Sequence, residues 1–398
     1  MWDYDVARDV VTIVNEWNLV CDAKWTISAA SVYHLIGALV LLPLLGQMSD
    51  KVGRKPVACG CVLLSLAATV VALHAKKVIP FFTARMFISA AWSPIEMALL
   101  VLLFESSDCT HRLYYCSMAE VGSVVATLVE NALEYCTLSR RLVCSMALAP
   151  SVIFLLVFVF VEESPLWLFA TCDSFRGERV IRLAAKFNKA GTNIAALITR
   201  HSKAKSKWPK PSMNFCELLF SPSHRSHTLA LCWVWFSLFV TRYGMPTHVD
   251  KTLNLQRTAI ELVPHLASMF ATATLLSGCK RKRVLSLVLP LASVLCGMLP
   301  LGIMTLPDDV FWILSELAHC SVYMNIIFVT VYSLEVFPTV IRGTGFSAVY
   351  FCGRLGAVVA SLLETVFHDA HPSVHVMVIS AFIFSCIFLL DYLPETKD

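Results

Sequence analysis

The sequence predicts an all-α polytopic membrane protein with about eleven transmembrane helices. Hydrophobic residues occupy 57% of the 398 positions and charged residues only 15%, whereas soluble domains carry about 25% charged residues. Apolar runs of about 20 residues, long enough to cross the ~30 Å hydrocarbon core as helices, recur along nearly the whole chain. These observations indicate a chain whose main environment is the lipid bilayer.

The expected spans follow one another with short polar turns between most of them. Two of them, around Arg242 and Glu261, contain ionisable residues within the apolar run. The eleven spans cover residues 25–48, 56–74, 79–105, 113–136, 142–161, 229–249, 258–278, 284–305, 310–334, 345–367 and 373–393.

One long polar stretch divides the spans into a group of five and a group of six. Its RVIRLAAKF portion has helical apolar spacing with basic residues between, which is typical of a helix lying on the membrane surface; a solvated linker is the alternative. The predicted organisation is the end of an extracellular loop (1–24), an N-terminal helical half (25–168), a basic cytoplasmic loop (169–226) and a C-terminal helical half (227–398).

The basic residues predict the orientation of the chain. They concentrate in the central loop, in KRKR at 280–283 and in the turn that contains Arg54, and short loops rich in Lys and Arg favour the cytoplasm. We therefore expect a cytoplasmic C-terminus. The formal charge of +4 arises from these loops, so it gives no reason to expect a nucleic-acid partner.

The charged turn GQMSDKVGRK, residues 46–55, lies between two apolar runs. Gly46 and Gly53 allow close backbone approach and a tight turn. Asp50 is expected near the positive N-terminus of a neighbouring helix. Arg54 is expected to pair with an acidic residue at the same membrane face.

Similar charged turns recur in the two halves. Glu105 is followed seven residues later by Arg112, and Glu335 is followed seven residues later by Arg342. A Pro/Glu turn then closes each half, EESPLWL in the first and LPET in the second. Glu105 and Glu163 are 58 residues apart in the first half, and Glu335 and Glu395 are 60 residues apart in the second. Such a repeat is typical of membrane transporters built from two related halves.

These motifs resemble those of a known family. GQMSDKVGRK resembles the G-x-x-x-D-x-x-G-R-R/K loop of the major facilitator superfamily. The segments TIVNEWNLVC, ESPLWL, YSLEVFPTVIRGTG and LPET resemble those of solute carrier family 22, the organic cation, organic anion and carnitine transporters. The resemblance implies two pseudo-symmetric helical halves and a multi-pass protein of the plasma membrane.

The resemblance also implies a gate of paired charges at the cytoplasmic face. Pairs that form in one state and break in another provide a two-state element that substrate can bias. Solvated turn charges are the alternative. The first cluster comprises Asp50, Arg54, Glu105, Arg112 and Glu163, and the mirror cluster comprises Glu335, Arg342 and Glu395, with Arg283 as an additional candidate.

Arg354 is the leading candidate for substrate binding. It lies twelve residues after Arg342, about three and a third helical turns into a span, and ionisable residues at such depth face a cavity or a partner. By resemblance, an arginine there is typical of anion and carnitine carriers, and it would bind substrate by a charge-assisted hydrogen bond. The alternative is a structural pair with a buried carboxylate such as Glu120 or Glu130.

Aromatic residues on two spans are expected to wall the substrate site, because aromatic surfaces suit bulky amphipathic ions. Packing or lipid contact is the alternative for each. The candidates are Trp235, Phe236 and Tyr243 on one span and Tyr323 and Tyr332 on another; Glu261 resembles an acidic residue of the family and is an additional candidate.

The sequence also departs from the family pattern. By resemblance, it lacks the first transmembrane helix and most of the large outer loop. The second copy of the loop motif, SGCKRKR, lacks the aspartate and the second glycine. Arg242 stands where the family has the first tyrosine of YYG.

We therefore expect a carrier of small organic ions that works by alternating access, with anionic or zwitterionic, carnitine-like substrates favoured by Arg354. The alternatives are an organic cation carrier and a non-transporting membrane protein that associates with full-length relatives. The expected partners are the organic ion and the lipid bilayer. No enzyme activity, nucleotide, cofactor or metal ion is expected, because no matching motif occurs.

Overall fold

All regular structure in the described part of the protein is helical. The structure is a computed structural model, and it describes residues 16–19, 25–108, 140–171, 173–189, 214–222, 225–245, 266–272, 280–367 and 371–396, with single positions between 112 and 129 and between 274 and 278. The prediction of an all-α protein is confirmed. The expected spans at 113–136 and 258–278 lie largely outside the described residues, as does Glu261.

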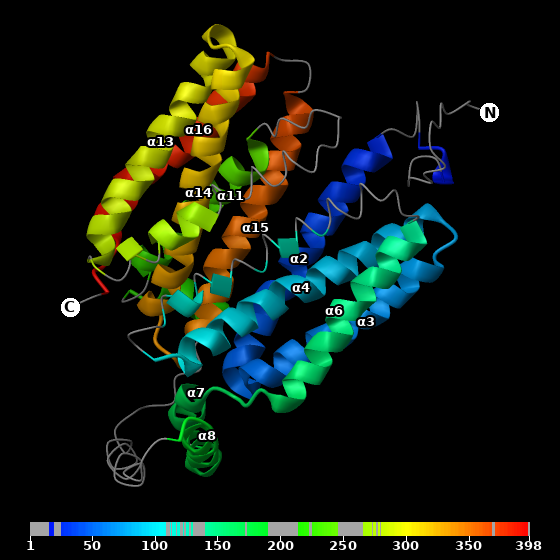
Figure 1. Ribbon diagram of the computed structural model, residues 1–398, viewed down its shortest axis with the longest axis vertical. Helices are drawn as coiled ribbons and strands as arrows, with labels where there is room; N and C mark the ends of the chain where they lie inside the picture. Colours follow the sequence, from blue (N-terminus) through cyan, green and yellow to red (C-terminus); the bar gives the residue numbers. More distant parts are fainter. Residues whose placement is uncertain are drawn as a thin grey trace.

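Four long helices form the described part of the first half (Figure 1): α2 (Trp25–Val52), α3 (Arg54–His74), α4 (Val78–Ser106) and α6 (Arg140–Phe160). The first of these is longer than its apolar run predicts, because it continues through the polar residues before Gly53. Gly53 has a φ of 118°, which favours glycine, and this single residue separates α2 from α3. Asp50 consequently lies in the last turn of a helix.

The second half contains five long or moderately long helices in the described residues: α11 (Arg225–Gly244), α13 (Arg281–Thr305), α14 (Asp308–Val336), α15 (Arg342–Val366) and α16 (Pro372–Ser385), which a 3₁₀ segment η3 (Cys386–Tyr392) extends. Each coincides with an expected span to within a few residues. The helices begin and end near charged or small polar residues, as expected where apolar spans reach water.

The central region contains short helices: α7 (Pro165–Ala170), α8 (Ser174–Phe187) and α10 (Phe215–Phe220). The Ser164 side chain accepts a hydrogen bond from the backbone N–H of Trp167 and caps α7, and Asp173 caps α8. Figure 1 shows α7 and α8 beyond one end of the long helices. The helix α8 has basic residues on one side, and Phe175 and Phe187 are exposed.

The outer surface fits a lipid environment. Seven of the described helices are long and apolar enough to cross a membrane. On α13 an exposed stripe recurs at three- and four-residue intervals, the spacing of one helix face, and consists of Leu287, Leu291, Val294, Met298 and Leu301. Such apolar exposure is large for a soluble monomer. The prediction of a polytopic membrane protein is confirmed.

The two halves meet where α2 packs against α15 (Figure 1). A Cβ atom added to Gly46 would lie 2.0 Å from the Ser347 hydroxyl oxygen, and one added to Gly343 would lie 2.9 Å from the Gly46 carbonyl oxygen. The two backbones are therefore close enough for side chains of one helix to reach the terminus of the other. The end of the bundle that holds Asp50, Arg54, Glu105 and Arg342 is called the network end below.

Candidate functional site

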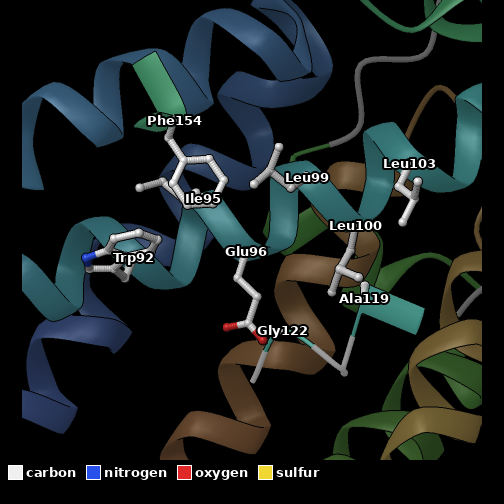
Figure 2. Close-up of a pocket in the computed structure, with 9 residues that line it drawn as sticks. All are labelled: Trp92, Ile95, Glu96, Leu99, Leu100, Leu103, Ala119, Gly122 and Phe154. Atoms are coloured by element: carbon white, nitrogen blue, oxygen red, sulfur yellow. The ribbon is translucent and has the colours of Figure 1, made fainter. Parts of the chain in front are cut away.

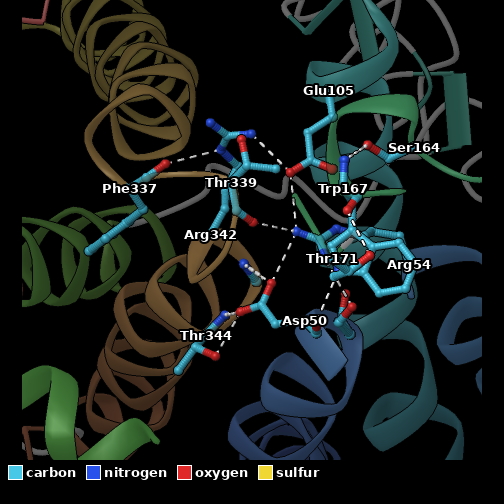
Figure 3. A network of polar contacts seen from close by, with 12 residues as sticks. Asp50, Arg54, Glu105, Ser164, Trp167, Thr171, Phe337, Thr339, Arg342 and Thr344 are labelled. Carbon is cyan, nitrogen blue, oxygen red and sulfur yellow. Dashed lines mark hydrogen bonds and ion pairs between the residues drawn. The ribbon is translucent and has the colours of Figure 1, made fainter. Parts of the chain in front are cut away.

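Arg54 is the fully buried centre of the polar network at the network end (Figure 3). Its guanidinium group donates to the Ser49 carbonyl at 2.9 Å and to Glu105 Oε1 at 3.1 Å. It also donates to the Thr339 carbonyl of the other half at 2.9 Å and lies 3.0 Å from Asp50 Oδ1. A buried charge needs such compensation, and Ser49, Asp50 and Glu105 of the same half supply most of it, while Thr339 adds one contact from the other half.

Asp50 caps a helix of the opposite half. Its carboxylate accepts hydrogen bonds from the backbone N–H groups of Gly343 at 3.0 Å and Thr344 at 2.7 Å, and from the Thr344 hydroxyl at 2.8 Å. The local N-cap residue of α15, Ile341, has no side chain that can do this. A carboxylate at a helix N-terminus satisfies free N–H groups and interacts favourably with the helix dipole.

Glu105 joins the halves a second time. Its Oε1 atom lies 3.1 Å from Arg54 and 2.9 Å from Arg342 of the other half, and its side chain is buried. The guanidinium groups of Arg342 and Arg112 lie 4.9 Å and 4.3 Å from the Phe104 ring centroid. One carboxylate thus pairs with two buried cations, and the Phe104 ring on the same helix contacts Arg112 and Arg342, two of the three arginines of the expected gate.

Glu163 and Glu395 occupy equivalent places in the two halves. Glu163 accepts hydrogen bonds from the first two backbone N–H groups of α3, at 3.2 and 3.0 Å. Glu395 accepts from the first two backbone N–H groups of α13, at 2.8 and 3.2 Å. The similar spacing of the charged turns in the two halves of the sequence therefore corresponds to the same helix-capping contact, made once inside each half.

The second cluster differs from the expected one. Arg281, not Arg283, pairs with Glu335, with Nε 3.1 Å from Oε2, and the Thr396 hydroxyl donates to the same carboxylate at 2.6 Å. Arg281 is the first residue of α13 and buried, whereas Arg283 is exposed because two residues further along a helix points to another face. Arg342 belongs to the cross-half network with Glu105.

A second polar group lies deeper in the bundle, between α4 and α15. Arg354 Nη2 donates to Glu96 Oε2 at 2.9 Å, and the Tyr350 hydroxyl donates to the same oxygen at 2.5 Å. The Arg354 side chain is 17% exposed and that of Glu96 is 46% exposed. The expected alternative partners, Glu120 and Glu130, lie outside the described residues. Among the described residues, Glu96 is the carboxylate that pairs with Arg354, and it is not among the partners predicted from the sequence.

Aromatic rings support this pair from the second half. The Arg354 guanidinium carbon lies 4.9 Å from the Tyr350 ring centroid and 5.9 Å from that of Phe239. Trp235 packs edge-on against Tyr350 at 5.4 Å and donates to the Ser333 hydroxyl at 3.0 Å. Because Trp235 is fully buried, it holds Tyr350 in place and does not itself border open space.

Arg242 makes a separate aromatic contact between α11 and α14. Its guanidinium carbon lies 3.8 Å from the Tyr323 ring centroid and 5.9 Å from that of Tyr243, and it also donates to the Tyr323 hydroxyl. The Tyr243 side chain is 43% exposed. No carboxylate among the described residues pairs with Arg242. The residue that departs from the family pattern thus engages two of the expected aromatic candidates.

The other two aromatic candidates lie apart from Arg354. Phe236 packs against Trp233 at 5.6 Å and against Phe382 of α16 at 5.8 Å. Tyr332 is buried near the network end, where its hydroxyl donates to the Pro394 carbonyl at 2.5 Å. The structure does not bring these two rings together with Arg354.

A cavity of about 300 Å³ adjoins Glu96 in the first half. Figure 2 shows Trp92 and Glu96 one turn apart on α4, with the Glu96 carboxylate directed toward Gly122. The Trp92 and Phe154 rings meet edge to face at 5.7 Å. The lining is apolar apart from this carboxylate and comprises Trp92, Ile95, Glu96, Leu99, Leu100, Leu103, Ala119, Gly122 and Phe154.

Residues 14–398 match the family described as "Sugar (and other) transporter". The chain belongs to this family. The structure agrees with that membership: it superposes on the proton:xylose symporter XylE of the major facilitator superfamily with a TM-score of 0.74, at 16% sequence identity and over 95% of this chain and 88% of that one. The expected major facilitator fold is confirmed.

The related sequences are transporters of solute carrier family 22 type, as the motifs indicated. The chain is 24% identical to the organic cation transporter protein of Drosophila melanogaster over 99% of its length and 73% of the relative. It is 26% identical to solute carrier family 22 member 7 of Mus musculus over 100% of its length and 74% of the relative. The chain spans between 60% and 74% of the length of the curated relatives compared with it.

Proposed function

We propose that the chain carries small organic ions across a membrane by alternating access, with the network end as the cytoplasmic gate. The observation that supports this most is the cross-half network, in which Asp50 caps α15 and Arg342 pairs with Glu105. These contacts join the two halves, whereas α3 and α13 are capped by glutamates of their own half. Such contacts can separate without unfolding either half, because Glu163 and Glu395 each cap a helix of their own half.

The cytoplasmic assignment of the network end rests on its basic residues. Lys51, Arg54, Lys55, Lys282 and Arg283 cluster where α2 passes into α3 and where α13 begins. Positive charge in short loops favours the cytoplasmic side. The same assignment places the C-terminus in the cytoplasm, and the family resemblance favours the plasma membrane.

Anionic or zwitterionic substrates are favoured by Arg354, which offers charge-assisted hydrogen bonds from a largely buried position. Organic cation transport is the second candidate, and a specific observation supports it: Glu96 is nearly half exposed beside an apolar cavity that contains Trp92 and Phe154. A carboxylate with aromatic neighbours is the chemistry that binds organic cations. Tyr243, Tyr323 and Arg242 are proposed as further contacts of the substrate path.

The test is uptake into cells of a labelled organic anion, a carnitine-like zwitterion and a small organic cation. The chain is compared with a version extended by the first helix and outer loop of a relative, and both are quantified at the cell surface. Saturable uptake by the chain supports the proposal. Uptake by the extended version alone assigns the activity to a longer protein. Absence of uptake by both contradicts the proposal and favours a non-transporting membrane protein.

A further inference from the structure

The charge balance at Arg354 restricts what can bind there. In the described structure Glu96 already compensates Arg354, and Tyr350 donates to the same carboxylate. An anion that displaced Glu96 from Arg354 would leave that carboxylate uncompensated. A cation that displaced Arg354 from Glu96 would leave the guanidinium group uncompensated. Leaving the largely buried Arg354 unpaired is strongly unfavourable, and the cost is smaller for Glu96, which is nearly half exposed.

The surroundings of the two charges differ in a way that suits two different groups. Arg354 contacts Tyr350 and Phe239 and presents donors toward α4. Glu96 borders the cavity of about 300 Å³, which has Trp92 and Phe154 in its wall. A substituted ammonium group is attracted by a carboxylate and by aromatic faces, and its alkyl groups favour apolar walls. The cavity therefore fits the cationic end of a ligand better than its anionic end.

We infer that Glu96 is a second substrate-binding residue, and that the substrate is a zwitterion of betaine type. Its carboxylate takes the place of Glu96 on Arg354. Its quaternary or substituted ammonium group takes the place of Arg354 on Glu96, beside Trp92 and Phe154. Both protein charges then remain compensated, which neither a monoanion nor a monocation achieves.

The same geometry couples binding to the two halves. Glu96 belongs to α4 of the first half and Arg354 to α15 of the second, so the direct pair is a tie between them. A zwitterion inserted between the two charges replaces this tie with a longer, bridged one. Because the ligand is assumed to be a transported organic ion, this assignment rests on the proposed function.

Three matched probes test the inference. The zwitterion is 4-(trimethylammonio)butanoate, the cation is its methyl ester, and the anion is 5,5-dimethylhexanoate, in which carbon replaces the charged nitrogen. Uptake of each probe and the shift in melting temperature that it produces in the purified protein are measured. The unmodified chain is expected to prefer the zwitterion over either matched ion by at least about tenfold.

Two substitutions should replace the preference for the zwitterion, one with a preference for the anion and the other with a preference for the cation. Glu96→Gln should lose the preference for the zwitterion and favour the anion, because Arg354 is then uncompensated. Arg354→Gln should favour the methyl ester, because Glu96 is then uncompensated. Glu364→Gln on α15 is the matched control, since Glu364 is exposed, and it should change none of the ratios.

The outcomes separate the inference from the proposed function. Equal response to the zwitterion and the anion, or an unchanged ratio in Glu96→Gln, overturns the inference and leaves organic-ion transport standing if Arg354→Gln abolishes anion uptake. If none of the three probes is transported or stabilises the protein, while the protein is at the cell surface and folded, the inference falls. The proposed function falls with it only if the version extended by the first helix and outer loop of a relative is silent as well.

Discussion

Carboxylates shared between two partners organise both polar sites of this protein, with Glu105 buried and Glu96 nearly half exposed. Glu105 lies between Arg54 and Arg342, and Glu96 accepts from both Arg354 and Tyr350. Arg54 and Arg342 come from different halves, whereas Arg354 and Tyr350 both lie on α15, in the half opposite Glu96. Removing one member of a buried pair costs about 3–5 kcal/mol, so single substitutions at Arg54, Glu105 or Arg342 should alter function more than surface charge changes do.

Replacement of Arg354 by alanine should reduce uptake of organic anions or zwitterions by about 10- to 150-fold. This corresponds to loss of a hydrogen bond to a charged group, which contributes about 1.5–3 kcal/mol. Uptake rates normalised to surface protein measure the effect. Arg283→Ala is the control, because Arg283 is exposed at the start of α13. Unchanged anion and zwitterion uptake in Arg354→Ala would rule out the binding role.

Replacement of Asp50 by asparagine should open the network end. The amide loses the charge that pairs with Arg54 and that interacts with the N-terminus of α15. A charge at a partly buried helix terminus contributes up to about 2 kcal/mol, so the open population should rise by as much as about 30-fold. The measure is thiol labelling of a reporter cysteine at Ser347, which is buried beside Gly46.

The control for this experiment is Asp309→Asn, since Asp309 is an exposed acidic residue in the first turn of α14. It should leave the labelling rate of the reporter unchanged. A parent without the reporter corrects for native cysteines. An Asp50→Asn rate equal to that of the control would mean that Asp50 does not hold the network end closed.

At the scale of helices, close packing of glycines determines which side chains can meet. Gly46 and Gly343 let α2 approach α15 until Asp50 reaches the first N–H groups of α15. The same packing buries the cross-half pair of Glu105 and Arg342. The gate network is therefore a consequence of backbone approach as much as of charge.

Substitution of Gly46 by alanine should separate α2 from α15 at the network end. The added methyl group would lie 2.0 Å from the Ser347 oxygen, and overpacking of this kind costs about 1–3 kcal/mol. Reporter labelling near the interface, placed at Thr344 so that Ser347 is retained, should rise about 5- to 150-fold. Gly60→Ala on α3 is the matched control, because nothing lies within 4 Å of a Cβ there. Equal labelling in the two variants would contradict the packing argument.

The helices could be predicted from the sequence because each span is a continuous apolar run that must cross the bilayer. The ends of the helices could not be predicted from the sequence, because α2 continues to Val52 through polar residues that are typical of a loop. Charge spacing identified Glu105 and Arg342 but not their pairing, because sequence repeats do not show which half a side chain faces. Arg281 had a signal in the sequence that was missed: Arg281 and Lys282 precede an apolar run as Arg54 and Lys55 do.

Glu96 was not predicted as a site residue because it belongs to no recurring motif. The available signal was physical: a carboxylate within a span is costly and requires a partner or a cavity, and Trp92 lies one turn away on the same helix. The pairing of Glu96 with Arg354 depends on the packing of α4 against α15, which a single sequence does not specify.

For the whole molecule, the structure presents two helical halves joined at the network end. The described ties there are the Arg342–Glu105 pair, the hydrogen bond from Arg54 to the Thr339 carbonyl, and the capping of α15 by Asp50. Opening this end requires that all three separate together. The contacts inside each half, such as those of Glu163 and Glu395, can persist.

The central claim, that these ties form a gate which opens during transport, is tested most directly by labelling the Ser347→Cys reporter. An impermeant thiol reagent is applied to the cytoplasmic face in inside-out vesicles, with and without a saturating transported ion, and with and without Arg342→Gln. The account predicts slow labelling at rest, a changed rate with the ion, and faster labelling in Arg342→Gln. A rate that neither the ion nor the substitution alters would contradict it.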